Sequence, residues 1–213
     1  MKNKNIEQRS YHFEIRAERS EKGISTLKGT PIVYGAETDI GGWFREIIDP
    51  GALEGANLKD VPLLVNHNER MIPIARSRNN TPKSTMRLIP TASGMDMEAD
   101  IDTERNATAK ELDSAVERGD INGMSFKFSV SDERWEGLET DYPTRHITKF
   151  DTIAEVSAVT WPAYEATSIY AARSKEVLDN ARSALDSARR DRSKSPDGDL
   201  ELLKAKTMIL GGL

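Results

Sequence analysis

The sequence predicts a mainly β fold of the α+β class. Short runs of alternating polar and apolar residues recur along the first 170 positions, and one clear helical pattern interrupts them. After residue 171 the composition changes to Ala, Ser, Arg, Asp and Leu, with apolar residues at helical spacing. The length of 213 residues fits one domain with an appendage.

Short strands separated by turns account for most of the first 170 residues, which we call the body. Residues 12–17 and 95–101 alternate with a period of two, as half-buried antiparallel strands do. Residues 61–65 form a more uniformly apolar run. Residues 123–130 and 153–161 predict two further strands, and the polar stretch between these two is expected to be an exposed loop or a loose hairpin.

Helices are expected in two places. The pattern over about residues 103–118 gathers its apolar side chains on one side and ends at Gly119. Residues 173–213 contain two amphipathic stretches, separated by the helix breakers at 195–198. We expect these tail helices to pack against the body, a second copy of the chain or another protein.

The net charge of −5 is unevenly divided along the chain. Residues 171–213 carry nine Lys or Arg and seven Asp or Glu, a local charge of +2, which leaves −7 on the body. Nucleic acid binding needs a basic face, so the body is not expected to bind nucleic acid. The absence of cysteine excludes disulfides, thiolate zinc sites and a cysteine nucleophile.

Targeting and cofactor motifs are lacking in the sequence. No apolar run approaches the ~18 residues of a membrane helix, so no membrane partner is expected. The first ten residues lack the apolar centre of a secretory signal, and we expect the protein to stay in the cytosol where it is made. No phosphate-binding glycine loop, HExxH zinc motif or calcium loop occurs, so no cofactor or metal is expected.

His67 and Ser125 are candidate catalytic residues. His67 follows an apolar run, where a strand passes into a polar turn and could hold an imidazole as a general base. A surface histidine in a turn is the plainer interpretation. Ser125 lies on the less apolar face of its strand, either as a small residue or as a nucleophile that passes its proton to a nearby base.

Glu155 is the most unusual residue of its strand. It interrupts an apolar face between Ile153 and Ser157. A carboxylate that points inward should be paired or hydrogen-bonded, because burying it alone costs several kcal/mol. Its partner is either Arg145, in a structural ion pair, or the imidazole of His67, whose tautomer the carboxylate would then fix.

Four sequence blocks together resemble the tailed-phage prohead proteases. In chain order they are REIIDPGAL at 45–53, VPLLVNHN at 61–68 with PIAR at 73–76, NGMSF at 122–126, and AEVSAVTWPA at 154–163. The blocks occur in the family's order, and the resemblance covers about residues 11–172.

The resemblance implies a serine endopeptidase related in fold to the herpesvirus assembly proteases, a β-barrel with a few surrounding helices and a helical C-terminal tail. On this match His67 is the general base, Ser125 the nucleophile and Glu155 the acidic third member. The herpesvirus relatives use a second histidine as third member, which makes His146 the rival of Glu155. The Glu-Val-Ser block matches the phage pattern and favours Glu155.

The same resemblance implies partners and a location. Such proteases are enclosed in the immature phage shell in the host cytoplasm, where they cut the scaffolding part of the major capsid protein and usually themselves. Some viral relatives act as homodimers. We accordingly divide the chain into a flexible N-terminus (1–10), a protease domain (11–172) and a helical tail (173–213) that targets the enzyme or is itself cut off. The alternative is a non-catalytic assembly or scaffolding module that binds coat protein.

Overall fold

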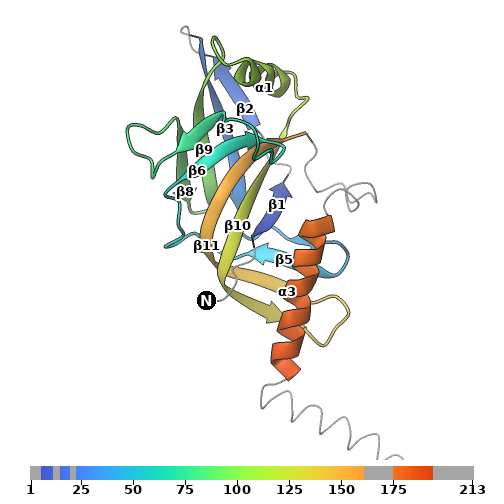
Figure 1. The fold of residues 1–213 in the computed structure, drawn as a ribbon. Coiled ribbons are helices and arrows are strands. Elements are labelled where there is room, and N and C mark those ends of the chain that lie inside the picture. Colours follow the sequence, from blue (N-terminus) through green and yellow to red (C-terminus); the bar gives the residue numbers. More distant parts are fainter. Residues whose placement is uncertain (1–5, 12–14, 20–22, 161–174, 194–213) are drawn as a thin grey trace, which may run out of the picture.

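The structure is a computed structural model that describes residues 6–11, 15–19, 23–160 and 175–193 (Figure 1). This part of the chain is mainly β, with two α-helices. The predicted mainly β, α+β class is therefore confirmed.

The strands form two sheets. Sheet A has seven strands, in the order β1 (Glu7–Tyr11), β10 (Gly123–Glu136), β11 (Thr144–Val159), β5 (Phe44–Ile48) and β4 (Thr38–Ile40), with β6 (Val61–Val65) paired to β11 and β7 (Ala75–Ser77) paired to β6. Sheet B has four strands, in the order β2 (Ile15–Arg19), β3 (Ile24–Val33), β9 (Gly94–Asp102) and β8 (Met86–Thr91).

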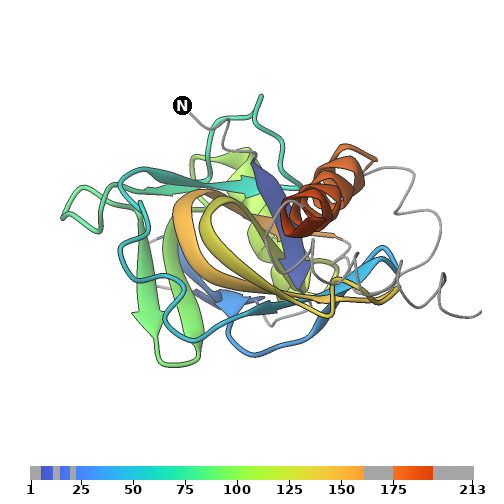
Figure 2. The same ribbon diagram turned by 90° about the horizontal axis from the view of Figure 1, so that it is seen from below.

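The β10–β11 hairpin is the centre of sheet A. Its two long antiparallel strands curve together, as the yellow and orange segments of Figure 2 show, and register shifts interrupt their pairing at several points. On its other edge β11 pairs in parallel with β5 near its start and with β6 near its end. The hairpin alternative for the stretch after residue 130 is confirmed, because β10 continues to Glu136 and β11 begins at Thr144.

The hydrophobic core draws on both sheets. The period of two predicted for residues 95–101 is confirmed, because the apolar side chains of β9 are fully buried at Met95, Met97, Ala99 and Ile101. Phe126 and Phe128 of β10 stack with ring centroids 5.0 Å apart, and Phe150 meets both edge-on. One face of β10 is thereby committed to packing, which leaves Ser125 and Lys127 on the opposite face.

Helix α1 (Ala107–Glu117) lies within the range predicted for it. Asn106 caps its first turn by accepting a hydrogen bond from the Ala109 backbone N–H. Four residues of the predicted range precede the helix, because the chain from Thr103 forms a turn before Asn106 starts it. Ala109 and Val116 are buried and attach the helix to the core.

Helix α3 (Lys175–Ser193) confirms the first predicted tail helix. Ala181 and Leu185 are buried against Ile40 and Phe44, at the far end of sheet A from α1 (Figure 1). The tail helix therefore packs on the body of its own chain. The second apolar stretch, beyond residue 198, lies outside the described residues.

Two further expectations concern the N-terminus and the barrel. The N-terminus expected to be flexible covers residues 1–10, but its residues from Glu7 onward belong to β1, which pairs with β10 through a backbone ladder and is held by buried ion pairs. Among the described residues the strand pairings also do not close into a barrel, since β1 and β4 end the main path of sheet A. The fold relationship to the herpesvirus proteases stays a prediction.

The two described helices were also compared with the requirements for a membrane-spanning helix. Neither has the length and apolar character needed to cross a membrane.

Candidate active site

His67 lies in a turn with an unusual backbone. The turn follows β6, and both Asn66 and His67 adopt left-handed conformations, with φ of 51° and 57°. Such values are uncommon outside glycine and persist where the surroundings impose them. Here the Asn66 backbone N–H donates to the Ala158 carbonyl at 2.9 Å, and the Asn66 side-chain oxygen accepts from the Thr160 N–H at 3.0 Å. The turn is thus fastened to the end of β11.

The imidazole of His67 contacts Glu155 of β11. Nδ1 of His67 lies 2.5 Å from Oε1 of Glu155, a carboxylate that is only 3% exposed. The carboxylate makes Nδ1 the protonated nitrogen, because it has no proton of its own to donate when ionised. Nε2 of His67 is buried and has no hydrogen-bond partner. The ring therefore keeps a buried acceptor nitrogen that is not shared with another group.

Ser157 completes this contact. Its hydroxyl donates to Oε2 of Glu155 at 2.6 Å and accepts the backbone N–H of His67 at 3.2 Å. Both oxygens of the carboxylate are thus engaged, one by the imidazole and one by the hydroxyl. This arrangement holds the carboxylate and the turn in one geometry.

Ser125 lies on the neighbouring strand, β10. Its Cα is paired with that of Ser157, so both side chains leave the same face of the sheet. The Ser125 side chain is fully buried, and its hydroxyl donates to the backbone carbonyl of Arg9 on β1 at 2.7 Å. Ser125 is thus the cross-strand neighbour of Ser157, the residue that contacts both Glu155 and His67, and Ser125 makes no hydrogen bond to Nε2 of His67.

Arg145 and His146, the two residues considered as alternatives in the contact between His67 and Glu155, bind other residues. Arg145 forms ion pairs with Glu7, Glu46 and Glu133, so the structural ion pair considered for Glu155 is not made. His146 places Nδ1 2.8 Å from Oδ1 of Asp49, away from the contact that His67 makes with Glu155.

A second ion pair flanks the site. Lys127, two residues after Ser125 on β10, places Nζ 2.5 Å from Oε1 of Glu69, in the loop after His67. The hydrogen bond and the positive charge of Lys127 lower the pKa of Glu69. Glu69 therefore stays ionised near the imidazole. In the described part of the chain no three His, Asp or Glu side chains are grouped as metal ligands would be.

Comparison with protein families identifies the chain. The family model described as caudovirus prohead serine protease matches residues 10–181, which include His67, Ser125 and Glu155. The chain belongs to this family. It is thus a serine peptidase of phage capsid maturation, which acts on capsid proteins within the procapsid. No curated protein and no solved structure matched the chain.

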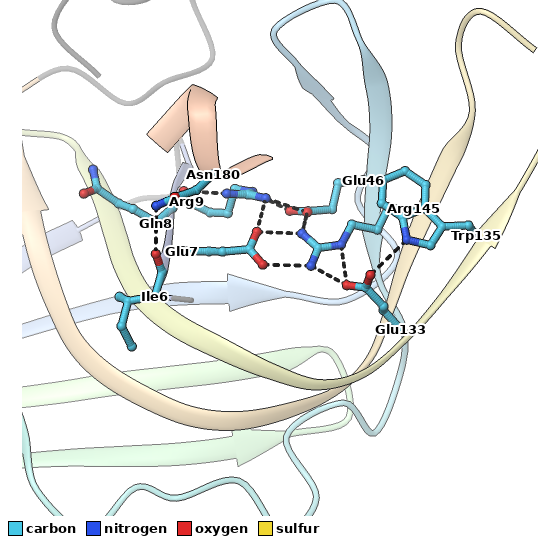
Figure 3. A network of polar contacts seen from close by, with 9 residues as sticks. All are labelled: Ile6, Glu7, Gln8, Arg9, Glu46, Glu133, Trp135, Arg145 and Asn180. Carbon is cyan, nitrogen blue, oxygen red and sulfur yellow. Dashed lines mark hydrogen bonds and ion pairs between the residues drawn. The ribbon is translucent and has the colours of Figure 1, made fainter. Parts of the chain in front are cut away.

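A buried ion-pair network joins β1 to the rest of this prohead protease (Figure 3). The Arg9 guanidinium donates to both oxygens of Glu46, at 2.5 and 2.7 Å. Arg145 donates to both oxygens of Glu7, at 2.6 and 2.8 Å, and also pairs with Glu46 and Glu133. Each charge in the network therefore has at least one opposite charge within contact distance.

The network shifts the ionisation of its members. Burial alone would raise the pKa of Glu7, but the neighbouring Arg145 and Arg9 outweigh it and lower the pKa to about 2. Burial would lower the pKa of both arginines, and the carboxylates around them raise it instead. Glu7, Arg9 and Arg145 are consequently all charged at neutral pH.

Several residues around the prohead protease site were not anticipated. Ser157 shares a strand face with Glu155 and could have been found from the period of two alone. The left-handed backbone of Asn66 could have been expected from its residue type, because asparagine adopts this conformation more readily than most residues, whereas its bond to Thr160 has no local sequence signal. The contact of Ser125 with β1 depends on pairing between segments more than a hundred residues apart.

Proposed function

We propose that this chain is the endopeptidase of prohead maturation and acts through Ser125 as nucleophile, His67 as general base and Glu155 as the residue that orients the base. The observation that carries the proposal is the contact of His67 Nδ1 with Glu155 beside a buried Nε2 that has no partner. A base of this kind needs one nitrogen held by an orienting group and the other left to receive a proton.

The proposed reaction is acyl transfer to Ser125 followed by hydrolysis. Nε2 of His67 takes the hydroxyl proton as Oγ attacks the scissile carbonyl carbon, and the imidazolium is stabilised by Glu155. The proton then passes to the leaving amine. Water enters with the same base and releases the acyl group, which restores the serine hydroxyl.

The proposed substrates are the scaffolding part of the major capsid protein and the protease itself. The location is the interior of the immature shell, in the host cytoplasm. We further propose that residues 173–213 recruit the enzyme to the shell or are removed after assembly. The packing of α3 on sheet A supports a tail that is held until that stage.

Co-expression of the chain with the major capsid protein tests the proposal. The native chain should remove the scaffolding part, and Ser125→Ala should leave it intact while the fold is retained. Ser157→Ala is the matched control, because it removes a serine hydroxyl from the same site and leaves Ser125 and Nε2 of His67 in place. This variant should still cleave the capsid protein. Cleavage by Ser125→Ala would overturn the role of Ser125 as nucleophile, and absence of cleavage by the native chain would favour the non-catalytic assembly module.

A further inference from the structure

Strand β1 lies along β10 as an extended peptide. The two strands are antiparallel, with Arg9 opposite Phe126 and the next residue, Ser10, opposite Ser125. Because β1 ends the main path of sheet A, its removal would leave the edge of β10 unpaired. Peptides commonly bind such an edge by adding a strand, with the main chain supplying affinity and alternate side chains supplying specificity.

The Arg9 carbonyl lies at the nucleophile. Ser125 Oγ is 2.7 Å from the Arg9 oxygen, within direct hydrogen-bond distance of the peptide group that joins Arg9 to Ser10. We propose that residues 7–11 occupy the peptide-binding edge of β10 as a substrate does, and that Ser125 cleaves the bond between Arg9 and Ser10. This inference rests on the proposed function, because it requires Ser125 to be the nucleophile.

The side chains before the bond occupy built subsites. Arg9 is 5% exposed and is held by both oxygens of Glu46 on β5. Glu7, two residues earlier and on the same face, is 6% exposed and is held by both outer nitrogens of Arg145 on β11. Both contacts are visible in Figure 3. The preferred peptide therefore carries a basic residue before the cut and an acidic residue two positions earlier.

Strand β1 controls whether another peptide can reach Ser125. Ser125 is fully buried while β1 is paired with β10, so another peptide reaches it only after β1 has left. The family match begins at residue 10, so a cut after Arg9 would remove only residues outside the matched region. Departure of residues 1–9 after self-cleavage would open the part of this edge that Glu7, Gln8 and Arg9 cover, up to the neighbour of Ser125, to capsid protein.

The reaction balances as an ordinary hydrolysis. The Ser125 proton moves to Nε2 of His67 as Oγ bonds to the Arg9 carbonyl carbon, and the carbon–nitrogen bond to Ser10 breaks as that proton passes to the Ser10 amine. Water then attacks the ester, gives a proton to His67 and releases residues 1–9 with a free carboxylate at Arg9. The proton held by His67 returns to Ser125.

Intact mass and N-terminal sequencing of the full-length chain test the proposal. The purified chain should acquire Ser10 as its first residue during incubation, and Ser125→Ala should not. Retention of the segment before Ser10, in a chain that still cleaves capsid protein through Ser125, would overturn this inference and leave the proposed function intact. Failure of both cuts would overturn the proposed function as well.

Specificity is tested in trans, where folding of the variant is not involved. A synthetic peptide spanning residues 3–16 should be cut after Arg9 by the processed enzyme, and a peptide with Arg9→Glu should be cut at least tenfold more slowly. Gln8→Ala is the matched control and should change the rate less than twofold. Equal rates for the Arg9→Glu and native peptides, or cleavage at another bond, would overturn the assignment.

Discussion

Two buried polar clusters on sheet A differ in whether every polar atom that the comparison concerns has a bonding partner. The network around Arg9 and Arg145 pairs each charged group with an opposite charge. The cluster around His67 uses both oxygens of Glu155 but leaves Nε2 buried without a partner. A buried polar atom without a partner costs free energy. The first cluster therefore holds strands together, whereas the second leaves a nitrogen that can accept a proton, as the proposed mechanism requires.

Replacing Glu155 should produce the largest effect on activity. In Glu155→Gln the side-chain amide can donate to Nδ1 of His67, which would put the imidazole proton on Nε2 and remove its acceptor. We expect kcat for capsid cleavage to fall by ~10³- to 10⁴-fold, with little change in KM. Steady-state kinetics on a capsid-derived peptide measures the effect.

Glu69→Gln is the control for this change. Glu69 is a carboxylate whose pKa is influenced by His67 but which bonds Lys127 instead of the imidazole. Its kcat should stay within about threefold of the native value. Equal losses in Glu69→Gln and Glu155→Gln would show that only general negative charge near the imidazole matters.

Replacing Arg145 should produce the largest effect on stability. Arg145→Met leaves Glu7, Glu46 and Glu133 without their shared cation in a buried site. The free energy of unfolding should fall by about 3–5 kcal/mol, as when one partner of a buried ion pair is removed. Denaturant unfolding measures it. Arg134→Met, which removes an exposed arginine from the same hairpin, should lower it by less than ~1 kcal/mol.

Protonation of Glu7 at low pH should lower the free energy of unfolding. Because its pKa is lowered from 4.5 to about 2 in the folded chain, Glu7 adds stability that is fully present above about pH 5. That contribution should be lost as the pH falls from 4.5 toward 2, where the folded carboxylate becomes protonated. The free energy of unfolding as a function of pH measures it. The loss over this range should be smaller in Glu7→Gln, and an unchanged acid profile in that variant would contradict the assignment.

Removing the Ser157 hydroxyl should have the smallest effect. Ser157→Ala frees one oxygen of Glu155 and the backbone N–H of His67, while Nδ1 of His67 keeps its partner. We expect kcat to fall by about tenfold, which corresponds to a loss of about 1.4 kcal/mol of transition-state stabilisation. The native rate in this variant would show that Glu155 is held well enough by His67 alone.

Local sequence pattern was sufficient for the secondary structure near the site. A period of two identified β9 and the face of β10 that packs into the core, because alternate side chains of a strand leave opposite faces. The same pattern wrongly placed Glu155 on the face of Ile153, because a register shift between Lys127 and Phe128 puts Glu155 opposite Lys127 and Ile153 opposite Phe128. Helix α1 began four residues later than expected, since the capping position at Asn106 decides where hydrogen bonding starts.

Pairing between distant segments decided the rest. Whether Glu155 met Arg145 or His67 depended on the parallel register of β6 with β11, which aligns Leu64 with Ser157 and brings the following turn to the carboxylate. The position of β1 on β10, and hence the contact of Ser125 with Arg9, depended on the burial of Glu7 and Arg9 among charges from three other strands. A local sequence pattern predicts on which face of a strand a side chain lies. Only the pairing of strands in the folded chain brings together groups that are far apart in sequence.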